Sequence, residues 1–474
     1  MTESSLARRG GPGAVRPRML RGLLPLLAYQ GVFLIAAIIW FPVLLWRLCF
    51  DRRYRRSFLP RTGRIPAMQG DRPRVWVHGV SVGEVKNLAR LIEAVEARHP
   101  EVEIVVSATT PTGFDLARRL YGARPVVQYP LDFGNFPGRA LDRVQPRCVL
   151  LMELEIWPNF LQAAARRSIP VAVVNGRISE RSFRGYRLAR GLLPQFDWIE
   201  SYCVQNETYR DRLLALGVSQ ERIAVTGNMK YDGVSLRGTS IESQRIRAWL
   251  SPDGREVLVC GSTHPREEEW LTDTCLRVAK RLGRALRLVL VPRHPERAPA
   301  VVEALLARKA GVVRWSELGE ARPVLGDADV ILVDTIGHLE TFYGACDVAF
   351  VGGSLVPHGG QNMLEPAALG RAVVFGPYTS NFRTDVELLL QSEAVVQVQD
   401  VAALETALTT LFSEPAARER LGERAVALIR GNQGATSRTL ELIAPLLDRT
   451  LSSTAGERPR GGISVGGLDR VPPP

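Results

Sequence analysis

The stretch "WVHGVSVGEVKNLARLIEAV", residues 76–95, joins a short β-rich run, a tight glycine-containing corner and a helical pattern. The run before the corner is almost continuously apolar, which is typical of a strand that is buried on both faces. After the corner, apolar residues recur with the spacing of one helical face. Because a strand followed by a helix is the repeating unit of parallel sheets, this stretch predicts an α/β fold.

The same alternation extends over most of the chain. From residue 74 to about residue 232, short apolar runs alternate with helical patterns, and the alternation starts again with "EVLVCGS" at residues 256–262. The polar segment "DGVSLRGTSIES", residues 232–243, separates the two series and indicates a domain boundary. We therefore predict two doubly wound, Rossmann-like domains over residues 65–235 and 245–450, which face a cleft lined by strand ends.

The net charge of +12 is concentrated at the N-terminus. Residues 1–64 contain twelve arginines and two acidic residues, while residues 65–450 have a net charge of about +1. A nearly neutral body lacks the basic footprint of a nucleic-acid-binding protein, so we expect no nucleic-acid partner.

The basic N-terminal segment encloses an uncharged apolar run at residues 23–46. At about 1.5 Å per residue, such a helix is long enough to cross a hydrocarbon core of roughly 30 Å. We therefore predict a membrane anchor within residues 1–64. A buried core helix and a shallow helix with both ends on the cytoplasmic side are the alternatives. The tail, residues 451–474, is rich in glycine and proline and is expected to be disordered.

Cysteine and histidine residues offer no metal site. The six cysteines are scattered without a C-x-x-C pair, and the six histidines form no H-E-x-x-H cluster. This pattern is typical of a reducing compartment and predicts neither a disulfide framework nor a structural metal.

Ser81 and Glu84 have the spacing of a helix-capping box, in which the glutamate satisfies backbone N–H groups and has no chemical role. However, Glu84 also follows the carboxyl end of a predicted strand, where open α/β enzymes place their catalytic groups. From the spacing alone we favour the cap, and the choice between cap and base stays open.

Other polar residues also follow predicted strands. In the first half these are Glu153, Glu155, Asn175, Arg177 and Lys230; in the second half they are Arg293, Arg297 and a glycine-rich loop that leads to Asn362. Glycines let backbone amides approach an anion, so this loop is a candidate phosphate site. Each group also has a structural interpretation: either glutamate caps the next helix or pairs with Arg177, and Asn362 with Glu365 has capping-box spacing.

At these residues the sequence resembles a known family. The motifs "HGVSVGEV", "SATTPTG", "ELEIWPN", "NGRISERS", "GNMKYD", "GSTHPREEE", "VPRHPER", "DTIGHLETFYGACDVAFVGGS" and "GGQNMLEPAALG" occur in the order found in 3-deoxy-D-manno-octulosonic acid (Kdo) transferases. The resemblance covers roughly residues 65–430 and also includes the N-terminal apolar segment.

The resemblance implies an inverting, metal-independent GT-B glycosyltransferase. Such an enzyme moves Kdo from CMP-Kdo to an anionic lipid A precursor, lipid IV-A, at the cytoplasmic face of the inner membrane. CMP-Kdo is then a substrate, and no cofactor is expected. Inversion needs one displacement, and therefore one base that accepts the proton of the acceptor hydroxyl.

The resemblance also implies roles for individual residues. Glu84 corresponds to the proton acceptor, and Glu155 with Lys230 corresponds to the pair that stabilises the transition state. The positions that bind CMP are Pro292, Arg293, Ile336, Gly337, His338, Asn362, Met363, Leu364 and Glu365.

Two positions depart from the family pattern. The family turn usually reads Met-Gly-Glu where this chain has Ile336, Gly337 and His338, and a histidine commonly stands where Gln361 is found. If the turn contacts CMP through its backbone, the replacement has little effect on donor binding. If the family's glutamate carboxylate holds the nucleotide, its absence here changes donor affinity or preference.

Two alternative functions are also compatible with the sequence. The first is a membrane-associated GT-B transferase that uses another nucleotide sugar, such as a UDP-sugar. The second is a non-catalytic lipid- or nucleotide-binding scaffold with the same fold.

Overall fold

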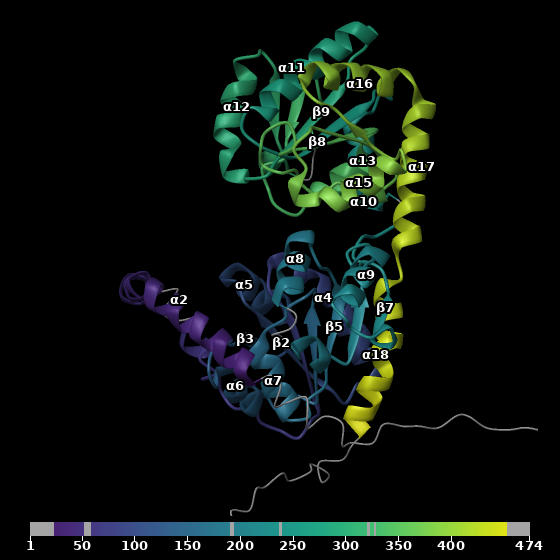
Figure 1. The fold of residues 1–474 in the computed structure, drawn as a ribbon. Coiled ribbons are helices and arrows are strands. Elements are labelled where there is room, and N and C mark those ends of the chain that lie inside the picture. Colours follow the sequence, from purple (N-terminus) through teal and green to yellow (C-terminus); the bar gives the residue numbers. More distant parts are fainter. Residues whose placement is uncertain are drawn as a thin grey trace, which may run out of the picture. The chain divides into compact units, whose positions relative to one another are not determined.

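The computed structural model describes residues 23–51, 58–189, 194–236, 239–319, 323–326 and 329–452. The chain divides into two compact units (Figure 1). The first unit contains residues 1–229 together with residues 434–474, and the second contains residues 230–433. The predicted basic segment at residues 1–22 and most of the predicted disordered tail lie outside the described residues.

The first unit is built on a parallel sheet with the strand order β3-β2-β1-β4-β5-β6-β7 among the described residues. Its strands are β1 (Arg74–Gly79), β2 (Glu103–Ala108), β3 (Val126–Gln128), β4 (Cys148–Met152), β5 (Val171–Gly176), β6 (Ser201–Val204) and β7 (Ile223–Val225). Every pairing in it is parallel, as the sequence pattern predicted.

Helices cover both faces of this sheet. They are α4 (Val82–Arg98), α5 (Pro111–Leu120), α6 (Phe136–Val144), α7 (Pro158–Arg166), α8 (Glu180–Ala189), α9 (Glu207–Ala215) and α18 (Ala435–Ser452). In β1, Trp76 joins one hydrophobic cluster while Val75 and Val77 join the other, because successive side chains of a strand point to opposite faces. The continuous apolar run of β1 therefore reflects a strand that is buried on both sides.

The second unit repeats this architecture with the strand order β10-β11-β9-β8-β12-β13-β14, again parallel. Its strands are β8 (Val257–Thr263), β9 (Arg287–Pro292), β10 (Gly311–Arg314), β11 (Asp329–Leu332), β12 (Val348–Val351), β13 (Ala372–Phe375) and β14 (Val396–Gln397). Its helices are α10 (Ile241–Leu250), α11 (Glu267–Leu282), α12 (Ala298–Leu306), α13 (Leu339–Ala345), α14 (Leu364–Ala368), α15 (Arg383–Gln391), α16 (Val401–Ser413) and α17 (Pro415–Asn432).

The boundary between the units differs from the predicted one in two places. Lys230, which the sequence pattern assigned to the first domain, begins the second unit. Helix α18 was predicted within the second domain but belongs to the first unit, where Ile443 and Leu447 join the cluster under β1 and β4. An apolar face on α18 is visible in the sequence, but the sheet that it covers is not.

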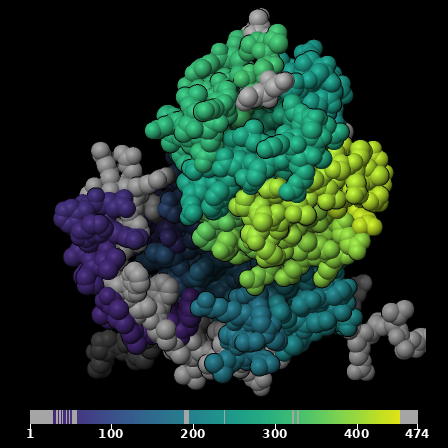
Figure 2. Space-filling view, turned by 90° about the horizontal axis from the view of Figure 1, so that it is seen from above, coloured from purple at the N-terminus to yellow at the C-terminus, as the bar shows by residue number. Residues whose placement is uncertain are grey.

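The apolar N-terminal run forms helix α2 (Leu23–Phe50), and its described atoms lie at the surface of the first unit (purple in Figures 1 and 2). Gln30 Nε2 donates to Oδ1 of Asn159 on α7 (3.1 Å), so the helix has a polar contact with the first unit. Over the residues that the structure describes, no helix is long and apolar enough to cross a membrane. The predicted membrane anchor is therefore not supported.

Candidate active site

Glu84 lies at the start of α4, directly after the corner that ends β1. Its Oε2 accepts from the backbone N–H of Val80 (2.8 Å), and its Oε1 accepts from the hydroxyl of Ser81 (2.8 Å). Ser81 is the N-cap of α4, and its Oγ accepts from the backbone N–H of Glu84 (3.4 Å). The capping box inferred from the spacing is therefore present in a shifted form, in which the carboxylate accepts from the N–H of Val80, the residue before the N-cap. An ionised carboxylate has about four acceptor positions, so these two bonds leave Glu84 able to accept a proton as well.

Glu153 and Glu155 follow β4, which lies next to β1 in the sheet. Glu153 has a φ of +58°, in the left-handed region that side chains other than glycine rarely adopt. Asn175, at the end of neighbouring β5, has a φ of +53°. Strained backbone of this kind persists only where the surrounding structure enforces it, and it is enriched at functional sites. No local sequence pattern indicates this strained backbone.

Neither glutamate caps α7, contrary to one interpretation of the sequence. That role belongs to Asp132, whose two carboxylate oxygens accept from the backbone N–H groups of Asn159 (3.0 Å) and Phe160 (2.7 Å). Instead, Glu155 Oε2 accepts from the indole Nε1 of Trp157 (2.7 Å). Asp132 was not among the predicted site residues, although it follows a predicted strand as the other candidates do.

Glu84, Glu153 and Glu155 form a carboxylate cluster at this edge of the sheet. Burial raises the pKa of Glu153 to about 7, and the negative charge of Glu84 adds to the effect. Burial also raises the pKa of Glu155 to about 7; the hydrogen bond from Trp157 opposes this, and Glu84 and Glu153 reinforce it. No ion pair between Arg177 and either residue is present in the described part of the chain. Glu153 and Glu155 therefore exchange protons with solvent near neutral pH, beside the carboxylate of Glu84.

This cluster predicts a pH-dependent stability. The Glu155 carboxyl group binds its proton more tightly in the folded protein than at its ordinary pKa of 4.5, so the free energy of unfolding falls as the pH rises from about 4.5 to about 7. Glu155→Gln should flatten this part of the curve and raise the free energy of unfolding at pH 8 by about 1 kcal/mol. Urea denaturation across pH values measures it. Glu93→Gln, at an exposed site on α4, is the control and should leave the curve unchanged; a Glu155→Gln curve parallel to that of the wild type would contradict the assignment.

Lys230, the first residue of the second unit, is held by α15. Its Nζ donates to Oδ2 of the buried Asp385 (2.5 Å) and lies 4.4 Å from the centre of the Phe382 ring. The hydroxyl of Tyr231 donates to the other oxygen of Asp385 (3.3 Å). Asp385 and Phe382 therefore fix the position of the ammonium group. The sequence offered no signal for this pairing, because 155 residues separate the two partners.

The structure distinguishes the two arginines that follow β9. Arg297 is neutralised by the buried Glu268, since its Nη1 donates to Oε1 at 2.8 Å. Arg293 is exposed and has no ion pair among the described residues, while its backbone N–H donates to the carbonyl of Thr263 (3.0 Å). Of the two, only Arg293 presents an uncompensated positive charge to an anionic ligand.

The turn at residues 336–338 follows β11 and begins α13. Gly337 has a φ of +101°, which the absence of a side chain permits. The ring of His338 packs edge-on against Trp315, with 5.5 Å between ring centres, and Ile336 is 87% exposed. His338 is therefore engaged by an aromatic side chain of its own unit.

The predicted CMP positions at residues 362–365 form a small network at the start of α14. Asn362 Nδ2 donates to Oε1 of Glu365 (3.0 Å), and Asn362 Oδ1 accepts from the backbone N–H of Leu364 (3.2 Å). The side chains of Met363 and Leu364 are fully buried in the hydrophobic core. In this structure neither residue is exposed to a ligand.

Glu267 changes the interpretation of the glycine-rich loop, residues 352–360. This buried carboxylate accepts from the backbone N–H groups of Gly353 (2.7 Å), Ser354 (3.1 Å), Leu355 (3.0 Å) and His264 (2.9 Å). The amides proposed to hold a phosphate are already bound to a protein anion. Glu267 therefore fixes the backbone of residues 353–355. Only the later residues of the loop are left to contact a ligand.

Comparisons with known proteins agree with this architecture. The family model of 3-deoxy-D-manno-octulosonic-acid transferase (kdotransferase) matches residues 56–233. The 3-deoxy-D-manno-octulosonic acid transferase of Haemophilus influenzae is 33% identical over 409 residues, which cover 84% of this chain and 93% of that protein. The enzyme of the same name from Bordetella pertussis is 35% identical over 384 residues, with coverages of 78% and 86%.

Among solved structures, the UDP-GlcNAc 2-epimerase of Neisseria meningitidis superimposes with a TM-score of 0.52 at 15% identity and covers 78% of this chain and 100% of that chain. A glycosyltransferase from Rickettsia africae gives a TM-score of 0.51 at 12% identity, with coverages of 81% and 100%. At such identities the likeness concerns the fold alone. The sequence relatives show the family as well as the fold, because about a third of their residues are identical to this chain over most of their length. This chain belongs to the 3-deoxy-D-manno-octulosonic acid transferase family.

Proposed function

We propose that this protein transfers Kdo from CMP-Kdo to the lipid A precursor lipid IV-A, with inversion at the transferred sugar and without a metal. The observation that carries the proposal is the carboxylate cluster of Glu84, Glu153 and Glu155 at the carboxyl edge of the first sheet, in a chain of this family. A direct displacement needs one group that removes the proton of the acceptor hydroxyl. Glu84 is assigned this role.

The remaining roles follow from charge and from the family resemblance. Departure of CMP leaves a phosphate monoester, and cations near that phosphate and near the Kdo carboxylate lower the energy of the developing charges. We assign Lys230 to this task, with its ammonium group fixed by Asp385. Glu155 is assigned as the second stabilising group from the family resemblance, not from its charge. Arg293, Pro292 and the segments at residues 336–338 and 362–365 would hold the nucleotide.

Lipid IV-A is an anionic lipid, and, as the family resemblance implies, this reaction would take place at the cytoplasmic face of the inner membrane. The direct test is to incubate the purified protein with CMP-Kdo and tetraacylated lipid A precursor and to analyse the lipid by mass spectrometry. A mass increase of one or more Kdo units is expected. An unmodified lipid beside a folded protein that binds CMP would refute the acceptor assignment.

Arg293→Ala should weaken CMP binding about tenfold or more, since hydrogen bonds from a guanidinium to a phosphate are among the stronger polar contacts. Isothermal titration calorimetry measures the change, and circular dichroism checks the fold. Arg420→Ala is the matched control, because Arg420 is exposed in the same unit and should leave CMP affinity unchanged. Equal CMP affinities of the Arg293 variant and the wild type would remove Arg293 from the site.

The second candidate is a transferase of the same fold that uses a UDP-sugar. His338, which stands where the family usually has glutamate, is the observation that favours it. Thermal stabilisation by UDP but not by CMP would support this candidate. A ligand that binds the folded state raises the melting temperature of the protein.

A further inference from the structure

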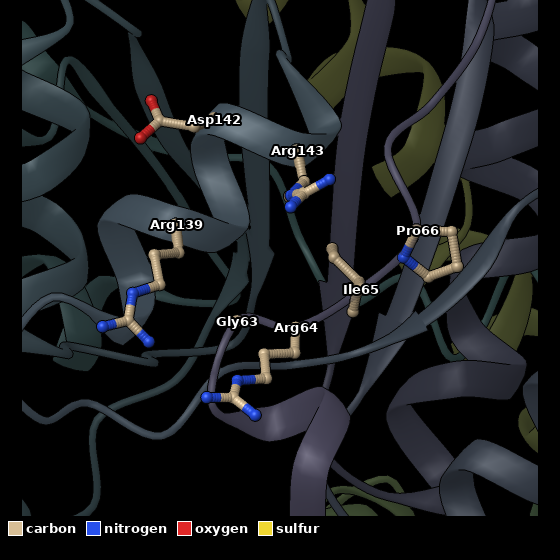
Figure 3. Close-up of a pocket in the computed structure, with 7 residues that line it drawn as sticks. All are labelled: Gly63, Arg64, Ile65, Pro66, Arg139, Asp142 and Arg143. Carbon is tan, nitrogen blue, oxygen red and sulfur yellow. The ribbon is translucent and has the colours of Figure 1, made fainter.

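A separate pocket opens on the flank of the first unit, between helix α6 and the segment at residues 63–66. It has a volume of about 680 Å³, and its lining residues are Gly63, Arg64, Ile65, Pro66, Arg139, Asp142 and Arg143 (Figure 3). Gly63 has a φ of +80°, and a Cβ atom there would lie 2.5 Å from the carbonyl oxygen of Phe136. Glycine therefore lets this segment lie directly against α6 and bring Arg64 to the arginines of the helix.

The charge of this pocket is not balanced. Arg64, Arg139 and Arg143 are exposed, and no ion pair or side-chain hydrogen bond neutralises any of them among the described residues. The one acidic residue of the lining, Asp142, is bound by both Nε (2.8 Å) and Nη2 (2.9 Å) of Arg167. In Figure 3 the Asp142 carboxylate lies well apart from the guanidinium group of Arg64. Within the described part of the chain, the pocket therefore contains three arginines without an acidic partner.

A pocket of the second unit offers a comparison, because three of its four arginines have an acidic partner. It is lined by four arginines, but Arg247 pairs with Asp347 (2.5 Å), Arg284 pairs with Glu256 (2.7 Å) and Arg255 pairs with Asp253. Like charges around one pocket repel one another, so three arginines without an acidic partner are informative beside a pocket whose arginines are mostly paired.

The pocket is distinct from the candidate active site. Arg143 lies near the end of α6, and its carbonyl accepts from the backbone N–H of Met68 (3.2 Å). A few residues later, the backbone N–H of Arg147 donates to the carbonyl of Arg74, the first residue of β1 (2.7 Å). This part of α6 therefore faces the amino ends of the strands, whereas Glu84 and Glu155 follow their carboxyl ends.

We propose that this three-arginine pocket binds a phosphate monoester carried on a larger group, either a lipid headgroup or a soluble sugar phosphate. Guanidinium groups match the oxygens of phosphate through paired hydrogen bonds. The volume exceeds that of a bare phosphate and lies in the range of pockets that hold small organic ligands. The proposal goes beyond Kdo transfer and does not depend on it.

The test uses the full chain and two phosphate sources. Binding to phosphatidylcholine vesicles with and without 20% phosphatidic acid is measured by flotation, and binding of glucose 1-phosphate is measured by calorimetry. The variant Arg64→Gln/Arg139→Gln/Arg143→Gln should reduce the gain from phosphatidic acid about tenfold or more, because each basic residue near an anionic surface adds to binding. Arg245→Gln/Arg420→Gln/Arg430→Gln removes the same charge from exposed sites of the second unit and should change that gain less than about twofold.

Each outcome either supports or refutes a phosphate site in this pocket. Loss of vesicle binding in the pocket variant alone assigns a lipid headgroup, and loss of glucose 1-phosphate binding in that variant assigns a soluble ligand. If both variants lose binding equally, or if neither does, the pocket is not a phosphate site. If the triple variant fails to fold by circular dichroism, Arg139→Gln/Arg143→Gln, which leaves the segment at residues 63–66 intact, is measured in its place with the same expected direction.

Discussion

Glu84→Gln is expected to reduce Kdo transfer at least about a hundredfold while the fold and CMP affinity stay nearly unchanged. The structure explains why the two effects should separate. The amide oxygen of glutamine can still accept from the backbone N–H of Val80, and its NH₂ group can donate to Oγ of Ser81. The cap is thus retained, but an amide cannot accept the proton of the acceptor hydroxyl. Steady-state transfer assays and thermal denaturation measure the two properties.

Ser81→Ala is the matched control for this prediction. It removes the N-cap hydroxyl but keeps the carboxylate of Glu84, so it should cost about 1 kcal/mol of stability and leave transfer within about tenfold of the wild type. If Glu84→Gln lowers the melting temperature by several degrees yet transfers Kdo at the wild-type rate, Glu84 is only a cap.

Glu267→Ala is expected to destabilise the second unit by about 3 kcal/mol or more, because it leaves four buried backbone N–H groups without their acceptor. The segment at residues 352–356 should then exchange its amide hydrogens faster, and CMP affinity should fall because the same loop leads to residues 362–365. Hydrogen exchange measured by mass spectrometry follows the loop directly, and calorimetry follows CMP.

Glu269→Ala is the control for Glu267, since it lies in the same first turn of α11. Its half-exposed side chain pairs with Arg308 (3.2 Å), and a surface pair of this kind contributes about 1 kcal/mol or less. Unchanged exchange at residues 352–356 in the Glu267 variant would show that the four hydrogen bonds do not hold the loop.

The sequence alone was sufficient to predict the fold class. Strand and helix periodicities are local, and each βα unit is encoded within about 30 residues, as residues 76–95 illustrate. The capping box of Glu84 was likewise predictable, because its partners are Val80 and Ser81. Motif order gave the family, which the relatives confirmed.

Tertiary structure decided which polar side chains are available for chemistry. Asp132 caps α7, which leaves Glu155 uncommitted to that role; Asp385 holds Lys230; and Glu268 neutralises Arg297. The partners of Glu267 in the glycine-rich loop lie 86 to 88 residues away along the chain. Pairing over such separations depends on the order of strands in the sheet and on helix packing, and neither leaves a periodic signal in the sequence. For this reason, the sequence located the strand ends that carry polar residues, while the fold determined which of those residues are bound to protein partners and which remain for a ligand.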